Sequence, residues 1–283
     1  MGFHTKPTTF VGHVKIKVEN LQRSLIFYQD VLGFDLLEQT ISTVKLTSDG
    51  KTSILSLEQP DNVIPKQGRT TGLYHFAILL PKRADLANIV IHLVNKGIKF
   101  GSSDHLVSEA LYLNDPDGNG IEIYIDRDPS EWSWKGQEVA MKVDPLDFEN
   151  LLTTVKPGEK WQGMPEGTVI GHIHLHVSEL KKTEEFYVKG LGFDVVNRYG
   201  GQALFLSAGK YHHHIGVNTW NGVGAPTPSV NSVGIESFTL ILPNEEARNK
   251  CVSNLKKIGA KVMDVNHSLI TYDPSGNQVV LAV

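Results

Sequence analysis

The chain of 283 residues contains one long segment twice, and this internal repeat is the strongest constraint on its fold. Residues 12–35 read GHVKIKVENLQRSLIFYQDVLGFD, and residues 171–194 read GHIHLHVSELKKTEEFYVKGLGFD. A second similar pair is formed by GLYHFAILLP at 72–81 and GIESFTLILP at 234–243. Repeated segments of this kind indicate a supersecondary unit that is used more than once. Each half of the chain therefore contains two units, which gives four units in all.

The residue pattern within each unit predicts the order β-α-β-β-β. A unit opens with alternating apolar and polar residues, as at 13–18, which is typical of a strand. Apolar residues at helical spacing follow, and in the first unit these are Leu21, Leu25, Tyr28, Val31 and Leu32. Further helices are predicted near 84–96, 180–190 and 245–258, each ending near a possible C-cap glycine (Gly97, Gly190 and Gly259).

The order of the units predicts how the chain is divided. An N-terminal domain at 1–127 and a C-terminal domain at 167–283 would each contain two units. Residues 128–166 would form the linker between them. This linker is rich in tryptophan and proline, which suggests a packed segment, and its sequence PLDFENLL predicts a short helix.

The composition excludes several classes of protein. A hydrophobic content of 40% and a charged content of 20% are those of a soluble globular protein. The net charge of −4 argues against nucleic-acid binding, because no basic stripe is available to neutralise phosphates. No apolar run approaches a membrane span, and the N-terminal residues lack the apolar core of a signal peptide. The single cysteine, Cys251, cannot form an internal disulfide, which favours a cytoplasmic location.

The stretch from His105 to Glu122, HLVSEALYLNDPDGNGIE, is the most informative about chemistry. Its turn DPDGNG at 115–120 recurs as DPSGNQ at 273–278, and the proline, asparagine and glycines suit a tight turn. After the turn, isoleucines alternate along one strand face while Glu122 lies on the other. A carboxylate in this setting is costly to bury without a partner. We therefore expect Glu122 to face a cation or a metal.

This stretch resembles the signature of the extradiol ring-cleaving dioxygenases, which belong to the vicinal-oxygen-chelate superfamily together with glyoxalase I. The residues that match the signature are His105, Leu111, Tyr112, Asp115, Pro116, Gly118 and Glu122. One departure is Ser103, at a position that the family usually fills with glycine, asparagine, threonine or an aliphatic residue. Because the four units follow the superfamily architecture, the resemblance covers nearly the whole chain and is greatest to bacterial catechol-2,3-dioxygenase-like proteins. It implies an α+β fold in which four β-α-β-β-β units pair into two cupped-sheet domains of the glyoxalase and extradiol type.

The resemblance also implies a metal site. His75, on the first strand of the second unit, matches one ligand of the extradiol enzymes, and Glu122 on its last strand matches another. Two histidines and one carboxylate are typical of non-heme Fe(II) oxygenases. The third ligand depends on how the units pair. His13 completes the set if the units pair in chain order, and His172 completes it if the second unit pairs with the third.

Two observations favour His172 as the third ligand. The strand face that carries His13 also carries Lys15 and Lys17, which would repel a cation in a closed cavity. The face that carries His172 instead carries other histidines, and strand alternation in YHHHIGVN predicts that His212 and His214 face the same way. The fourth unit has nothing comparable, since Ser237, Ile270 and Val280 stand where His75, Tyr112 and Glu122 would be.

The function implied by the resemblance is Fe(II)-dependent cleavage of catechol-type aromatic diols by O₂, as in aromatic hydrocarbon catabolism. His105 and Tyr112 match a proton-transferring histidine and a tyrosine that orients the substrate, and His214 is a candidate acid–base group from the facing unit. Manganese, zinc or nickel would also suit the predicted ligands. The predicted partners are an aromatic substrate and O₂, without nucleic acid or membrane. A homo-oligomer is compatible with the family, and the sequence does not determine the oligomeric state.

Two functions from other classes compete with this prediction. A glyoxalase-like isomerase or thiol transferase would usually draw one carboxylate from each paired unit, and only Glu122 is evident here. A metal-free binding protein of the bleomycin-resistance type would need neither His75 with Glu122 nor the spacing of His105 and Tyr112.

Overall fold

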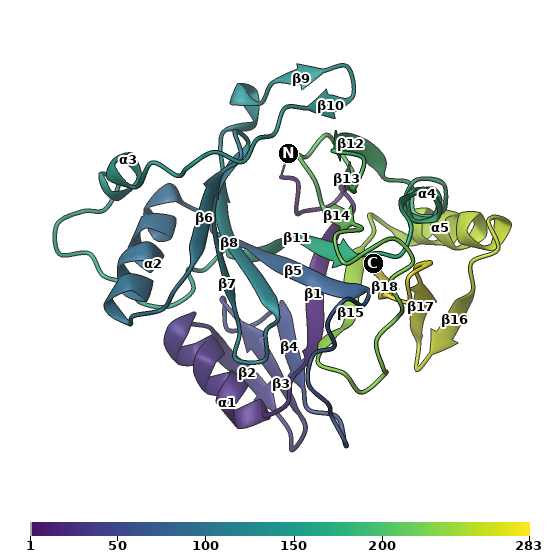
Figure 1. The fold of residues 1–283 in the computed structure, drawn as a ribbon, viewed down its shortest axis with the longest axis horizontal. Coiled ribbons are helices and arrows are strands. Elements are labelled where there is room, and N and C mark those ends of the chain that lie inside the picture. The colour runs from purple at the N-terminus through teal and green to yellow at the C-terminus, as the bar shows by residue number, and fades with distance from the viewer. Residues whose placement is uncertain (1) are drawn as a thin grey trace.

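The computed structural model describes residues 2–283, and each of the four units has the predicted β-α-β-β-β order (Figure 1). The first unit consists of β1 (Phe10–Lys17), α1 (Leu21–Ile26), β2 (Asp35–Gln39), β3 (Thr43–Thr47) and β4 (Leu55–Glu58). The second consists of β5 (Gly72–Leu79), α2 (Arg83–Asn95), β6 (Gly101–Asp104), β7 (Ser108–Asn114) and β8 (Gly120–Asp126). The third consists of β11 (Val169–His176), α4 (Leu180–Glu185), β12 (Asp194–Tyr199), β13 (Ala203–Ser207) and β14 (Ile215–Asn218). The fourth consists of β15 (Gly234–Ile241), α5 (Glu245–Lys257), β16 (Val262–Val265), β17 (Ser268–Tyr272) and β18 (Gln278–Ala282).

The units pair across the two halves of the chain, into two curled eight-stranded sheets. One sheet has the order β16-β17-β18-β15-β1-β4-β3-β2 and joins the first unit to the fourth. The other has the order β12-β13-β14-β11-β5-β8-β7-β6 and joins the second unit to the third. The predicted α+β class with two cupped sheets is thus confirmed, and of the two pairings left open, the structure has the second unit with the third. The division at 1–127, 128–166 and 167–283 describes the repeat along the chain and stays a prediction.

The helices lie at the two sides of the molecule, with α1 and α2 at the left and α4 and α5 at the right of Figure 1. The helix predicted at 180–190 is continued beyond α4 by a π-helical turn, Phe186–Gly190, and the first unit has the equivalent turn at Phe27–Val31. Gly190 is therefore the last residue of the helix and not its cap. Gly192, with φ of 83°, takes the left-handed conformation instead.

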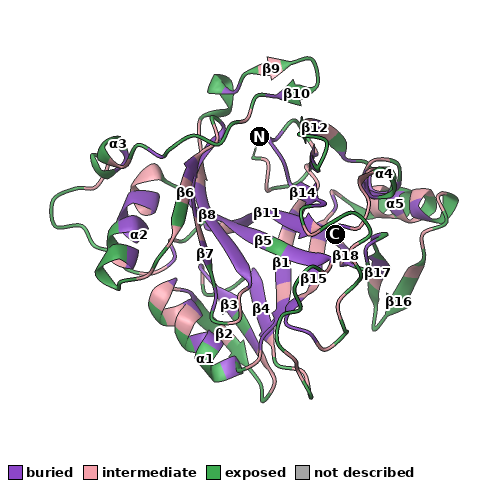
Figure 2. Ribbon diagram, in the orientation of Figure 1, coloured by how far each residue is buried: buried purple, intermediate pink, exposed green. Residues whose placement is uncertain are grey.

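The core consists of apolar side chains from the strands and from the inner faces of the helices. The central strands of both sheets are largely buried, whereas each helix exposes one face (Figure 2). The segment between the halves contains β9 (Trp134–Lys135), β10 (Glu138–Val139) and α3 (Phe148–Leu152), the last of these within the predicted PLDFENLL. Among the described residues 2–283, no helix is long and apolar enough to cross a membrane.

The repeated turns hold the two sheets together through matching tyrosines. The buried carboxylate of Asp115 accepts hydrogen bonds from the backbone N–H groups of Asp117 and Asn119, at 2.9 and 2.8 Å. It also accepts one from the hydroxyl of Tyr28 in the first unit, at 3.1 Å. In the other half, Tyr187 donates to Asp273 in the same way, at 3.3 Å. The π-helical turns of the first and third units are thereby each tied to a turn of the other sheet.

Replacement of Asp115 by alanine is expected to lower the free energy of unfolding by on the order of 3 kcal/mol, because buried donors lose a charged acceptor. Tyr28→Phe removes a single bond from the same carboxylate and should cost about 1 kcal/mol. Urea unfolding of the two variants measures both values. If both variants lost only a small and equal amount of unfolding free energy, the Asp115 carboxylate would have no central role.

Candidate metal centre

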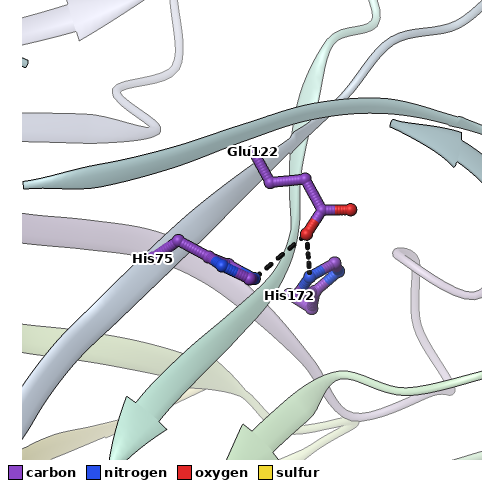
Figure 3. Close-up of side chains that lie close together, drawn as sticks. All are labelled: His75, Glu122 and His172. Atoms are coloured by element: carbon purple, nitrogen blue, oxygen red, sulfur yellow. Dashed lines mark hydrogen bonds and ion pairs between the residues drawn. The ribbon is translucent and has the colours of Figure 1, made fainter. Parts of the chain in front are cut away.

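Three predicted ligands from three strands of one sheet meet at one point. His75 lies on β5 and Glu122 on the parallel neighbour β8, where Ala77 is the register partner of Glu122. His172 lies on β11, which pairs with the other edge of β5. The nitrogen and oxygen atoms that the three side chains offer lie within 4.8 Å of one another. Figure 3 shows both imidazole rings directed at one carboxylate oxygen of Glu122.

The atoms of this cluster suit a bound metal better than a closed hydrogen-bond network. Oε2 of Glu122 lies 3.0 Å from Nε2 of His75 and 3.1 Å from Nε2 of His172. The three residues are only 6, 3 and 1% exposed, in the order His75, Glu122, His172. Nε2 of His75 is sealed from solvent, and its contact with Glu122 does not have the geometry of a hydrogen bond. A buried nitrogen without a partner is costly unless something else binds it. Two nitrogens and one oxygen around a common centre fit a divalent transition metal.

The protonation states also suit metal binding. Burial acts to raise the pKa of Glu122, but the neighbouring His172 and His75 outweigh it and hold this pKa well below its usual range. Burial lowers the pKa of His172 to about 4, even though Glu122 acts in the opposite direction. At neutral pH the carboxylate is therefore ionised and the His172 ring is neutral. These are the forms in which the two groups bind metals.

Glycines at the repeated Gly-His motif make room for the site. The register of β11 against β5 skips Gly171, so that this residue forms a bulge immediately before His172. A Cβ at Gly171 would lie 1.8 Å from the hydroxyl oxygen of Tyr124. On the other side of β5, a Cβ at Gly120 would lie 2.0 Å from the carbonyl oxygen of Tyr74. The glycines thus allow the close strand contacts that bring the ligands together.

A second bulge corrects one expectation about the faces of β5. Alternation predicts that Tyr74 faces away from His75, together with Phe76. The pairing of β5 with β11 instead skips Tyr74, since His174 pairs with His75 and the next pair is Leu175 with Leu73. As a result, Tyr74 lines the same cavity as His75.

The cluster opens into a cavity of about 330 Å³. Aromatic and aliphatic side chains make much of its wall: Tyr74, Val107, Met141, Val143, Tyr199, Phe205 and Trp220. Two of the predicted catalytic residues, His105 and Tyr112, also line it. Nε2 of His105 lies 2.6 Å from the hydroxyl of Tyr112, and Nδ1 of His105 lies 2.6 Å from the carbonyl oxygen of Lys142. The structure therefore brings His105 and Tyr112, as an interacting pair, to the cavity that His75, Glu122 and His172 also line.

His13, the alternative third ligand, lies in the other sheet. Its Nε2 is 2.8 Å from the hydroxyl of Ser56. Burial, with the positive charges of Lys15 and Lys45 nearby, lowers the pKa of His13 to about 4. Lys15 forms an ion pair with Glu58 at 2.6 Å. Within residues 2–283, His75, Glu122 and His172 are the only such group of side chains close enough to share a metal, so the His13 face has no comparable centre.

The structure does not bring His214 to the cavity. Both of its ring nitrogens face backbone groups, since Nδ1 accepts from the N–H of Ala208 and Nε2 lies 3.0 Å from the carbonyl oxygen of Phe3. His213 lines the cavity instead. The alternation prediction fails here because β14 begins only at Ile215, so that residues 211–214 lie outside the strand. The run of three histidines signalled this wall of the cavity, but it did not indicate which ring faces inward.

Comparisons with known proteins agree with this architecture. The family model described as Glyoxalase/Bleomycin resistance protein/Dioxygenase superfamily matches residues 10–123 and 169–281. The chain is 43% identical over 279 residues to a catechol-2,3-dioxygenase of Bacillus subtilis (strain 168), covering 97% of this chain and 98% of that protein. It is 31% identical over 122 residues to biphenyl-2,3-diol 1,2-dioxygenase 3 of Rhodococcus globerulus, covering 42% of this chain and 64% of that protein.

A solved structure shows the same fold at low sequence identity. Glyoxalase I from Zea mays superimposes with a TM-score of 0.59 at 16% identity, covering 97% of this chain and 92% of that one. The repeated units, the two curled sheets and the family match over both halves lead to one conclusion. The chain is a member of the glyoxalase, bleomycin resistance protein and dioxygenase superfamily.

Proposed function

We propose that this protein is an Fe(II)-dependent extradiol dioxygenase that cleaves catechol-type aromatic diols with O₂. The observation that carries the proposal is the cluster of His75, Glu122 and His172 at one end of a largely apolar cavity. The similarity over nearly full length to a catechol-2,3-dioxygenase supports the same reaction. The neutral aromatic substrate fits a wall of aromatic and aliphatic side chains, which also excludes water.

The proposed ligands leave room for the reactants. Two imidazole nitrogens and one carboxylate oxygen would hold Fe(II) and leave positions on the cavity side open. When bound there, Fe(II) supplies the redox chemistry that lets O₂ react with an aromatic diol. Both oxygen atoms enter the product as the ring bond beside one hydroxyl breaks, so that no further reductant is needed. Manganese, zinc and nickel would fit the same donor set, and the assay below compares zinc and nickel with iron.

Hydrogen bonding supports complementary roles for His105 and Tyr112. The carbonyl oxygen of Lys142 can only accept a hydrogen bond, so Nδ1 of a neutral His105 carries the proton. Nε2 of His105 is then an acceptor, and the hydroxyl of Tyr112 donates to it. Burial and the negative charge of Glu122 raise the pKa of Tyr112 well above its ordinary value. Tyr112 therefore remains a neutral phenol whose oxygen can accept a hydrogen bond from a substrate hydroxyl, and its own proton can pass to Nε2 of His105 as the substrate proton arrives.

The opposite wall of the cavity offers a second imidazole. The ring of His213 lies against that of His172, with centroids 4.1 Å apart. We propose His213, in place of His214, as the group from the facing unit that receives a proton from the diol. A cytoplasmic place of action is part of the same proposal, because the single cysteine is buried and free.

The decisive test is anaerobic reconstitution with Fe(II), followed by addition of air and a panel of substituted catechols. We expect O₂ uptake of one molecule per ring cleaved, together with a yellow semialdehyde product. Reconstitution with Zn(II) or Ni(II) serves as the control and should give no O₂ uptake. Turnover of methylglyoxal–thiol adducts without O₂ uptake would instead show a glyoxalase-like activity. If the protein retained no metal after reconstitution, this result would point to a metal-free binding protein of the bleomycin-resistance type.

A further inference from the structure

A chain of three side chains leads from the end of β8 to the cavity wall. The carboxylate oxygen Oδ1 of Asp126 lies 2.8 Å from Nε2 of His212. Nδ1 of His212 lies 2.8 Å from Nδ1 of His213. His212 is fully buried, whereas the side chain of Asp126 is 18% exposed. His213 lines the cavity, and no hydrogen bond within the described residues engages its Nε2. None of these contacts follows from the predicted roles of the metal ligands.

The order of donors and acceptors along this chain has a single solution for neutral rings. The carboxylate of Asp126 accepts, so Nε2 of His212 carries the proton. Nδ1 of His212 is then a bare acceptor, and Nδ1 of His213 must donate to it. Nε2 of His213 is consequently left without a proton. An unprotonated imidazole nitrogen on the cavity wall is a proton acceptor, which is the form that a general base requires.

We propose that Asp126 and His212 are positioning residues that hold His213 in the tautomer with a bare Nε2 on the cavity wall. This inference rests on the proposed function, in which a substrate diol gives up a proton in the cavity. The proton passes from a substrate hydroxyl to Nε2 of His213, which becomes an imidazolium, and it returns from there to the product. The charge of Asp126, transmitted through His212, stabilises that imidazolium without taking the proton itself.

The surroundings of Asp126 support this arrangement. The hydroxyl of Tyr211 donates to the same oxygen, Oδ1, at 3.1 Å. Tyr211 in turn lies 2.7 Å from the hydroxyl of Tyr124. The His212 ring packs on that of Tyr211, with centroids 4.0 Å apart. The bond from Tyr211 thus helps to orient the oxygen that accepts from His212.

A direct test of the tautomer uses nitrogen NMR of iron-free protein labelled with ¹⁵N-histidine. In the wild type, His213 should be protonated at Nδ1 and His212 at Nε2, with the His213 signals assigned by their loss in His213→Gln. An amide can donate a hydrogen bond to Nε2 of His212, so Asp126→Asn should shift His213 toward protonation at Nε2. A wild-type His213 protonated at Nε2 would overturn the proposal, whatever the activity.

The catalytic consequence is tested with a matched pair of variants at position 212. His212→Phe keeps an aromatic ring against Tyr211 but cannot accept a hydrogen bond, and kcat should fall about 10-fold to 100-fold. His212→Gln loses the ring, but its amide oxygen can accept from Nδ1 of His213 and should restore part of kcat. In both variants, KM and iron content should stay within about twofold of the wild type.

If His212→Phe kept its kcat and His212→Gln lost it, the result would show that His212 only fills space. Tyr211→Phe removes one bond to Asp126 but leaves the Asp126–His212–His213 contacts in place, so kcat should fall by less than in His212→Phe. If iron-loaded wild type turned over no catechol, the proposed function would fail together with the catalytic role of the relay. The NMR measurement would still decide the tautomer.

Discussion

His172→Ala should lose bound iron, whereas His13→Ala should retain it. His172 supplies one of three protein ligands to the proposed metal, and its Nε2 lies 3.1 Å from the shared carboxylate oxygen of Glu122. Removal of a ligand leaves an incomplete coordination shell, so the affinity for Fe(II) should fall by more than about 100-fold. His13 is bonded to Ser56 in the other sheet and contributes nothing to this cluster.

Iron content after anaerobic reconstitution and dialysis, together with competition by a chelator, measures the two affinities. Circular dichroism of both variants checks that the fold is kept, because each substitution removes a buried or half-buried ring. The reverse result, with His13→Ala emptying the site, would contradict the assignment of His172 and the unit pairing on which it depends.

Tyr112→Phe should retain iron but lose turnover by about 10-fold to 1,000-fold, which is the range for a positioned proton-handling group. The hydroxyl of Tyr112 lies 2.6 Å from Nε2 of His105 and lines the cavity beside Glu122. Its removal leaves the three proposed ligands in place, because the phenol is not one of them. The substitution does remove the hydroxyl through which His105 would exchange a proton with the substrate.

Steady-state kinetics with a catechol substrate should show the loss in kcat, accompanied by unchanged iron per chain. A matched control is Tyr74→Phe, which removes a hydroxyl from the same cavity without disturbing the His105 pair. Its kcat should remain within about threefold of wild type. Loss of iron from Tyr112→Phe would mean that the phenol supports the metal site directly.

Local patterns in the sequence were sufficient to predict the elements. Alternation and helical spacing located the four units, and α2 and α5 begin and end within one residue of the predicted 84–96 and 245–258. The turn signals at 115–120 and 273–278 were equally clear, because proline, asparagine and glycine have strong local preferences. The same patterns placed Glu122 on the inner face of β8, opposite its neighbouring isoleucines.

Bulges limited what alternation could predict about side-chain direction. One extra residue in a strand reverses the faces on either side of it. Tyr74 is such a residue, and it joins His75 in the cavity although the period of two places them apart. Alternation also failed for His212–His214, because β14 begins only at Ile215. As a result, His213 lines the cavity and His214 does not.

The sequence by itself determined the order of the four units and the Gly-His motifs, because each depends on residues close together along the chain. Its resemblance to the extradiol signature predicted His75 and Glu122 as ligands. Both His13 and His172 remained candidates for the third ligand, because each stands in a Gly-His motif, and the lysines beside His13 favoured His172. Only the tertiary structure decided that the second unit pairs with the third, since strand pairing between units depends on contacts that are about a hundred residues apart along the chain. The approach of His212 to Asp126 likewise arises only when folding brings the 211–214 segment to the end of β8.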